Sequence, residues 1–188
     1  MVANLINPNH QKIILAGQVL YVSQTSRGYC LRRLHESDYK LLIEMFLKLS
    51  ADTLQKRFMR PYFKIDVETA HEYVSHLWIA KAEKQYIVLA TVRERNREHA
   101  IAIAELLHSG KRTDPAEIAL VVRDDYQRDG VGSKLVLDLA QAAQARGITH
   151  WHADASIGNE GVRRLLQKSG RLYKSITRYG ETELSGTF

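Results

Sequence analysis

Hydrophobic residues in the first half of the chain recur mostly at helical spacing. The stretch HESDYKLLIEMFLKLS predicts a helix, and Ser37 or Asp38 is placed to cap its first turn. DTLQKRFM predicts a second, short helix, and Pro61 either ends it or redirects the chain. DVETAHEYVSHLWIAKA predicts a third helix with Asp66 as its cap. Before these helices, GQVLYVSQTSRGYCLRRL predicts two short strands around a turn at Ser26–Gly28.

The second half of the chain begins with strand-like runs. QYIVLATVRE, AIAIAELL and AEIALVVR are rich in β-branched residues and are separated by polar turns, which predicts three consecutive antiparallel strands. Helical spacing returns over residues 131 to 146 and stops at Gly147. THWHADAS predicts a strand, NEGVRRLLQKS a helix, and RLYKSITRYG with TELSGTF a final strand pair. A β–α–β crossover around residues 117 to 154 then gives an α/β (α+β) architecture.

Length and cysteine content limit the class of protein. A chain of 188 residues with 45% hydrophobic content can bury one core. We therefore expect residues 1–18 to be an N-terminal extension and residues 19–188 a single domain. Cys30 is the only cysteine, which excludes an intramolecular disulfide and a cysteine-based metal cage, and we expect no metal. No apolar run is long enough to span a bilayer, so we expect a cytoplasmic protein that does not associate with membranes.

The formal net charge of +6 favours an anionic partner, such as nucleic acid or a polyphosphate cofactor. The basic residues are dispersed, however. Acidic residues interrupt the densest groups, of which Arg93, Arg95 and Arg97 form one. A nucleic-acid-binding protein needs a continuous basic surface, so we do not expect nucleic acid as a partner.

The segment VVRDDYQRDGVGSKL combines a strand end, a glycine turn and a helix start. Free amides and the positive end of the helix dipole then meet at one place, which is an anion site. Gly130 and Gly132 would let a diphosphate approach the backbone, and Arg128 would add positive charge. The order Gly132-Ser133-Lys134 inverts that of a P-loop. The alternative is that the two glycines shape a tight turn and bind nothing.

The surrounding sequence resembles the GNAT acetyltransferase superfamily, whose central motif is Gln/Arg-x-x-Gly-x-Gly/Ala after the fourth strand. Gln127, Gly130 and Gly132 match that motif, and ASIGNEGVRRLLQKSG resembles the next one. LRRLHESDYKLLIEMFLKLSADTLQKRFM is similar to the start of the GNAT domain of bacterial Pat-type protein lysine acetyltransferases. The resemblance covers roughly residues 28 to 175. It implies a mostly antiparallel sheet of six to seven strands, helices on both faces, and a V-shaped splay between the fourth and fifth strands.

For the cofactor, the resemblance implies acetyl-CoA. The expected pyrophosphate site is the backbone of the glycine turn, and the expected pantetheine site is the end of the preceding strand. Asn159 would approach the pantetheine or the thiol. The expected cofactor-binding residues are Leu120, Val121, Val122, Gln127, Arg128, Asp129, Gly130, Val131, Gly132, Ser133 and Asn159.

Acyl transfer to an amine needs a base, because a free lysine with a pKa of about 10.4 is protonated at neutral pH. Glu117 matches the position at which Pat-type sequences carry a strand glutamate that serves as this base. The alternative for Glu117 is an ordinary surface carboxylate at a strand edge. Glu105 on the neighbouring strand is the rival base.

Three residues depart from the family pattern. Leu166 stands where many GNAT enzymes place a tyrosine that protonates the leaving thiolate, and Tyr173 is the nearest substitute. Arg171 replaces an aromatic residue, and Asp129 brings a carboxylate beside the expected pyrophosphate, which would weaken binding unless it points away.

We expect an acetyl-CoA-dependent N-acetyltransferase that is a monomer or a homodimer. Its acceptor would be a primary amine, on a protein lysine or a small molecule. The alternative is a non-catalytic acyl-CoA-binding regulatory module on the same fold.

Overall fold

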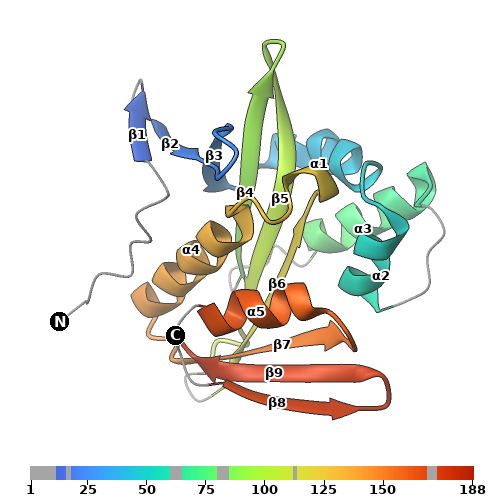
Figure 1. The fold of residues 1–188 in the computed structure, drawn as a ribbon, viewed down its shortest axis with the longest axis vertical. Helices are drawn as coiled ribbons and strands as arrows, with labels where there is room; N and C mark the ends of the chain where they lie inside the picture. Colours follow the sequence, from blue (N-terminus) through green and yellow to red (C-terminus); the bar gives the residue numbers. More distant parts are fainter. Residues whose placement is uncertain (1–11, 16–17, 60–64, 80–84, 112–113, 169–172) are drawn as a thin grey trace.

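The computed structural model describes residues 12–15, 18–59, 65–79, 85–111, 114–168 and 173–188 (Figure 1). Within them one nine-stranded sheet has the order β1-β2-β3-β4-β5-β6-β7-β9-β8. The strands are β1 (Lys12–Leu15), β2 (Gln18–Val22), β3 (Gly28–Arg33), β4 (Gln85–Glu94), β5 (Arg97–Leu107), β6 (Ala116–Val122), β7 (His150–Ser156), β8 (Tyr173–Arg178) and β9 (Glu181–Thr187). The helices are α1 (Tyr39–Phe46), α2 (Ala51–Phe58), α3 (Val67–Ile79), α4 (Val131–Ala145) and α5 (Glu160–Lys168), with 3-10 turns at Glu36–Asp38 and Asp124–Tyr126.

The α/β architecture and the mostly antiparallel sheet are confirmed, but the sheet is wider than the six to seven strands predicted. β2 lies in the predicted run GQVLYV, and the strand that the sequence did not predict is β1, which pairs antiparallel with β2 and extends the sheet at that edge. β1 lies inside the segment that was expected to be an N-terminal extension.

The sheet opens between β6 and β7. These two strands are parallel, and they pair only at Ala116 with Trp151 and at Glu117 with His152. Every other neighbouring pair in the described sheet is antiparallel and longer. The predicted V-shaped splay is therefore confirmed, although it lies between β6 and β7 of this sheet and not between its fourth and fifth strands, and it begins directly after Glu117. From Ile118 to Val122, the β6 backbone has no strand partner on the β7 side.

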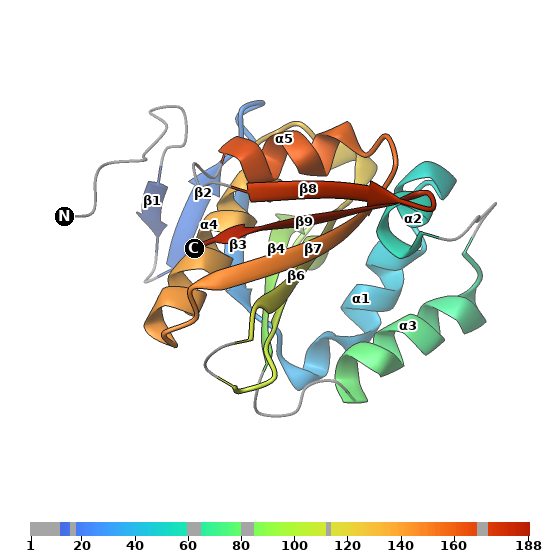
Figure 2. The ribbon, with the colours of Figure 1, turned by 90° about the horizontal axis from the view of Figure 1, so that it is seen from below.

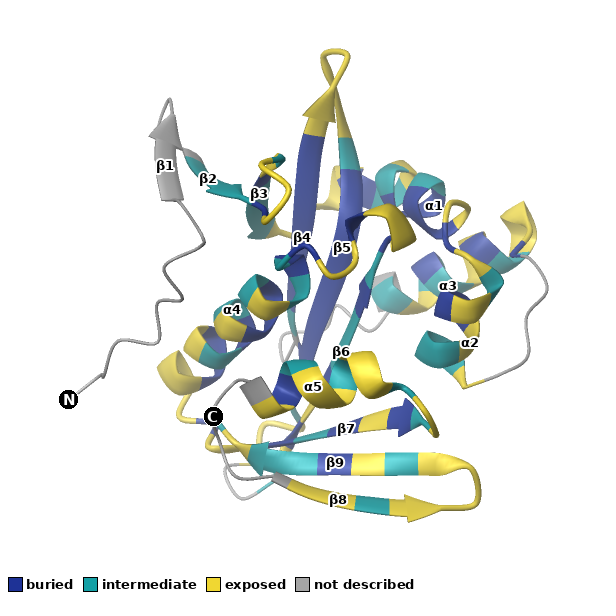
Figure 3. Cartoon of the chain, viewed as in Figure 1, coloured by how far each residue is buried: buried dark blue, intermediate teal, exposed yellow. Residues whose placement is uncertain are grey.

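Helices cover both faces of the sheet (Figures 1 and 2). α4 lies on one face, and the predicted stripe of this helix is buried in full: Val131, Leu135, Val136, Leu139, Ala142 and Ala143. α1 and α3 lie on the other face over a second apolar cluster. The central strands β4 and β5 are buried on both sides over most of their length, whereas α2 and α5 flank the open end of the sheet; α5 is largely exposed and α2 is partly buried (Figure 3).

Two of the predicted helix caps can be compared with the structure. Asp66 caps α3 as predicted, because its Oδ1 accepts from the amide of Thr69 at 2.7 Å. The prediction that Ser37 or Asp38 caps the helix at α1 is wrong, since α1 has no side-chain cap. The Asp38 carboxylate instead accepts two hydrogen bonds from Arg32 and one from the amide of His35. Pro61 lies outside the described residues.

None of the described helices combines the length and the apolar character that a transmembrane helix needs.

Candidate acetyl-CoA site

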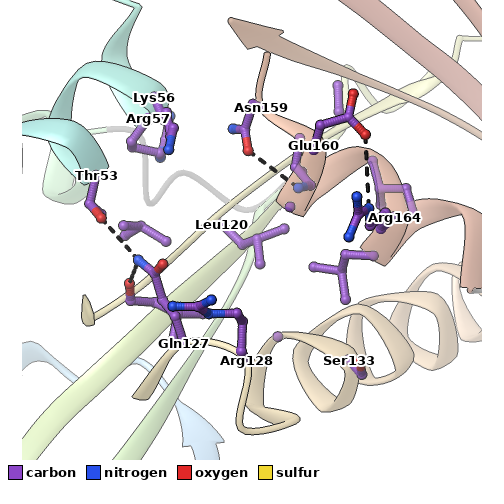
Figure 4. Close-up of a pocket in the computed structure, with 18 of the residues that line it drawn as sticks. Thr53, Lys56, Arg57, Leu120, Gln127, Arg128, Ser133, Asn159, Glu160 and Arg164 are labelled. Atoms are coloured by element: carbon purple, nitrogen blue, oxygen red, sulfur yellow. Dashed lines mark hydrogen bonds and ion pairs between the residues drawn. The ribbon is translucent and has the colours of Figure 1, made fainter. Parts of the chain in front are cut away.

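A pocket of about 630 Å³ lies in the opening between β6 and β7 (Figure 4). The exposed edge of β6 forms its floor, the turn before α4 and the start of α4 form one wall, and α5 and α2 close the other sides. Nine of the expected cofactor-binding residues line it: Leu120, Val121, Val122, Gln127, Arg128, Gly130, Gly132, Ser133 and Asn159. The pocket therefore gathers these residues from three separate segments of the chain.

The glycine turn presents unpaired amides to this pocket. The first amide of α4 that donates to a carbonyl four residues earlier is that of Lys134, which bonds to the Gly130 carbonyl at 3.2 Å. The amides that precede it in the first turn therefore lack an intrahelical partner. Gly130 has φ of 87°, in the left-handed region that favours glycine. At Gly132, an added Cβ would lie 3.2 Å from Leu165 of α5 and 3.7 Å from Leu120 of β6. A side chain there would narrow the pocket.

Asp129 and Val131 do not line the pocket with their side chains. Val131, the first residue of α4, is fully buried in the core. Asp129 is 2% exposed, and its carboxylate points away from the pocket toward the turn between β2 and β3. There it accepts from the Thr25 amide and hydroxyl at 2.7 Å each and from the Arg27 guanidinium at 2.9 Å. Burial alone would raise the pKa of Asp129, but the hydrogen bonds from Thr25 and Arg27 outweigh it and lower the pKa to about 2. The expected conflict between this carboxylate and an anion therefore does not arise.

Positive side chains outnumber negative ones on the pocket wall. The cations are Lys56, Arg57, Arg128 and Arg164, and the acids are Asp154 and Glu160. Glu160 is itself near Arg164 (3.9 Å) on the surface of α5. The balance suits a ligand that carries several phosphates.

Gln127 connects the glycine turn to α2. Its Nε2 donates to the Thr53 hydroxyl at 2.9 Å and to the Val122 carbonyl at 3.0 Å (Figure 4). Asp124, at the start of the same loop, accepts from the Ser50 amide at 2.9 Å and from the Thr53 hydroxyl at 2.7 Å. These bonds hold the first turn of α2 against the loop that carries the anion site.

The two candidate bases lie on the same face of the sheet and differ in environment. Glu105 is 5% exposed and forms an ion pair with Arg57 of α2 at 2.8 Å. Burial raises the pKa of Glu105 above its ordinary value, although Arg57 opposes this effect. Glu117 is exposed and stands at the last residue pair before β6 and β7 separate. Neither side chain lines the pocket itself, but Arg57 does.

Asn159 and Leu166 both lie on the α5 side of the pocket. Asn159 caps α5, because its Oδ1 accepts from the Val162 amide at 3.3 Å. Leu166 is 1% exposed and is part of the core. Arg171 lies outside the described residues, as does the side chain of Tyr173.

Four residues that line the pocket were not predicted from the sequence: Gln24, Thr53, Lys56 and Arg57. The three on α2 follow the spacing i, i+3, i+4, which places them on one helix face. That spacing was a usable signal in the sequence. The sequence holds no such signal for Gln24. Gln24 reaches the pocket because the neighbouring Thr25 bonds to Asp129, which lies 104 residues further along the chain.

No group of three histidine, cysteine or acidic side chains in the described parts of the chain could hold a metal ion.

Comparison with known proteins agrees with this geometry. Residues 29–171 match the profile of the acetyltransferase (GNAT) domain. The chain belongs to the GNAT acetyltransferase family. A curated relative, acetyltransferase Pat of Mycolicibacterium smegmatis, is 25% identical over 155 residues, which cover 80% of this chain and 43% of the relative. The chain thus spans under half the length of that relative.

Solved structures share the fold. The GNAT domain of PAT from S. lividans superposes with a TM-score of 0.71 at 19% identity, covering 98% of this chain and 100% of that domain. RimL, a ribosomal L7/L12 α-N-protein acetyltransferase solved with coenzyme A, gives 0.66 at 15% identity over 85% of this chain and 93% of RimL. A cAMP-binding acyltransferase from Mycobacterium smegmatis gives 0.57 at 19% identity, over 97% of this chain and 48% of that protein. At these identities the likeness concerns the fold.

Proposed function

We propose that this GNAT domain transfers an acetyl group from acetyl-CoA to a primary amine, carried by a protein lysine or by a small molecule. The observation that carries the proposal is the open edge of β6 next to the glycine turn. The edge of β6 that faces β7 has no strand partner from Ile118 onward and suits the amide groups of pantetheine, and the free amides before Lys134 suit a pyrophosphate. The cationic wall supports the same ligand.

For the chemistry, we assign the role of general base to Glu117. The acceptor ammonium must lose a proton before its nitrogen attacks the thioester carbon, forming a C–N bond while the C–S bond breaks and the thiolate leaves. Glu117 is exposed and can pass a proton to water, whereas the Glu105 carboxylate is held by Arg57. Glu105 remains the rival, because its raised pKa makes it the stronger base.

A second function, acyl-CoA binding without turnover, is favoured by one observation. Leu166 is buried at the position where many GNAT enzymes carry a tyrosine, so that position supplies no general acid. A thiolate is a tolerable leaving group without such help, and for this reason we prefer the enzyme.

The test combines calorimetry with a thiol-release assay. The protein should bind acetyl-CoA and release CoA when offered an amine from a panel of lysine peptides, polyamines, aminoglycosides and amino acids. Glu117→Gln should keep its affinity for acetyl-CoA and lose about 10² to 10⁴-fold in turnover. The difference in turnover between Glu117→Gln and wild type should shrink as the pH rises, because a larger fraction of the acceptor amine is then neutral.

Glu72→Gln, an exposed change on α3, is the matched control and should behave as the wild type. Loss of turnover in Glu105→Gln but not in Glu117→Gln would transfer the role of base to Glu105. Binding without turnover on the whole panel would favour the regulatory module, and absence of acetyl-CoA binding would contradict both functions.

A further inference from the structure

The turn between β2 and β3, residues Ser23 to Arg27, contacts the glycine turn through Asp129 and reaches the pocket through Gln24. Its backbone is closed by hydrogen bonds from the Ser23 amide to the Arg27 carbonyl and from the Ser26 amide to the Ser23 carbonyl. The Gln24 amide donates to the Asp129 carbonyl at 3.2 Å, which adds a backbone bond to those of the carboxylate. Two segments far apart in sequence thus form one layer at the base of the anion site.

Arg27 completes this contact. Its guanidinium donates to Asp129 Oδ2 at 2.9 Å and to the carbonyl of Asp125 at 2.7 Å, and it stacks on the ring of Tyr126 at 3.9 Å. The Arg27 side chain therefore hydrogen-bonds to both ends of the loop from Asp125 to Asp129. Arg128 has φ of 58° and Gly130 has φ of 87°. Two residues next to the contacts of Arg27 are therefore in the left-handed conformation.

A left-handed conformation at a residue other than glycine persists only when its surroundings hold it. The Asp129 carboxylate supplies that support without facing the pocket, since its hydrogen bonds go to Ser23, Thr25 and Arg27 of the turn between β2 and β3. Resting on the proposed function, we propose that Asp129 is a positioning residue for the phosphate-binding turn and that Gln24 is a contact for the phosphate-bearing part of CoA. The N-terminal strand pair thereby becomes a part of the cofactor site.

The sign of the effect separates positioning from plain electrostatics. Asp129→Asn removes a negative charge near a polyanion, so a purely electrostatic role predicts equal or tighter CoA binding. A positioning role predicts weaker binding, by about tenfold, which is a typical size for coupling between neighbouring sites. Asp125→Asn is the matched control: it removes the same charge from the same loop, but its carboxylate pairs with Arg123. It should leave CoA binding unchanged or slightly tighter.

The experiment measures binding of CoA and of pantetheine, which lacks the pyrophosphate and the nucleotide, by calorimetry or NMR titration. Asp129→Asn should weaken CoA binding and leave pantetheine binding unchanged. Gln24→Ala changes an exposed side chain that does not endanger folding, and it should weaken CoA binding about threefold to tenfold, the usual worth of one hydrogen bond. Gln141→Ala, an exposed position on α4 outside the pocket, is its control.

Wild-type CoA affinity in both Asp129→Asn and Gln24→Ala would overturn this inference alone. Equal losses for CoA and pantetheine in Asp129→Asn would also overturn it, because they would indicate general disruption, which thermal unfolding without ligand would register. A wild-type protein that does not bind CoA would overturn the proposed function, and this inference with it.

Discussion

Removing Arg57 should destabilise the protein by leaving a carboxylate buried and unpaired. Glu105 is 5% exposed, and Arg57 is its only recorded hydrogen-bond donor among the described residues. Breaking such a pair from one side costs about 3 to 5 kcal/mol. The Arg57 side chain is 24% exposed, so solvent weakens the pair, and we expect about 3 kcal/mol for Arg57→Met. In a domain of this length, that lowers the Tm by roughly 6 to 12 °C at pH 7.

The loss should depend on pH in a defined direction. Burial raises the pKa of Glu105 in the folded state, and without Arg57 that pKa rises further. A raised folded pKa means that stability is fully present below the unfolded pKa and is lost as the pH rises through the folded pKa. The difference in stability between wild type and Arg57→Met should therefore be small at about pH 4, below the ordinary pKa of a glutamate, and grow as the pH rises.

The assay is thermal and urea unfolding from pH 4 to 8, with Lys56→Met as the control. Lys56 is the adjacent residue of α2, and its ion pair with Asp52 is exposed, so its removal should cost less than about 0.5 kcal/mol. The double variant Arg57→Met/Glu105→Gln should recover most of the stability, since it removes the unpaired charge. A loss under about 1 kcal/mol at pH 7, or a loss that is larger at pH 4, would refute this reasoning.

Three further predictions concern single residues. Gly130→Ala places a Cβ at φ of 87°, so it should cost about 1 to 2 kcal/mol in urea unfolding and weaken acetyl-CoA binding; unchanged stability would contradict the left-handed conformation. Burial, aided by a hydrogen bond to Asp138 at 2.7 Å, raises the pKa of Tyr86 to about 12. The ultraviolet difference titration between wild type and Tyr86→Phe should thus have its midpoint near pH 12, and a midpoint near pH 10 would count against it. Asp124→Asn weakens the charge-assisted bonds to the first turn of α2, so hydrogen exchange of that turn should accelerate while that of α4 stays the same.

Elements whose stability is mainly local could be predicted from the sequence. The period of residues 131 to 146 identifies every buried position of α4, because one helix face is enough to define its core side. β1 was missed for the opposite reason. Four residues carry little periodicity, and β1 exists as a strand through its pairing with β2. The prediction of a side-chain cap for α1 is wrong because Arg32, six residues upstream of Asp38, donates hydrogen bonds to the Asp38 carboxylate.

In the candidate site too, features with a local sequence pattern could be predicted, and features that depend on long-range contacts could not. The glycine turn and Asn159 are short motifs, and a sequence resemblance can carry them. Gln24 and the α2 face around Thr53 reach the pocket through contacts that span 104 and 74 residues. The spacing of Thr53, Lys56 and Arg57 identifies a common helix face, but only the assembled sheet brings that face and Gln24 to the pocket. The roles of Glu117 and Glu105 depend equally on how α2 packs, because Arg57 of α2 distinguishes the two carboxylates.

The loop before α4 contains three aspartates, and from the sequence alone they argue against an anion site there. Asp124, Asp125 and Asp129 together would repel a phosphate if they faced it. Each carboxylate is instead directed to a different partner: Asp124 to α2, Asp125 to Arg123, and Asp129 to the turn between β2 and β3. What remains on the pocket side is the helix amides and Arg128. Asp124 and Asp129 fix the loop against α2 and against the turn between β2 and β3, so their negative charge stabilises a surface that is itself suited to anions.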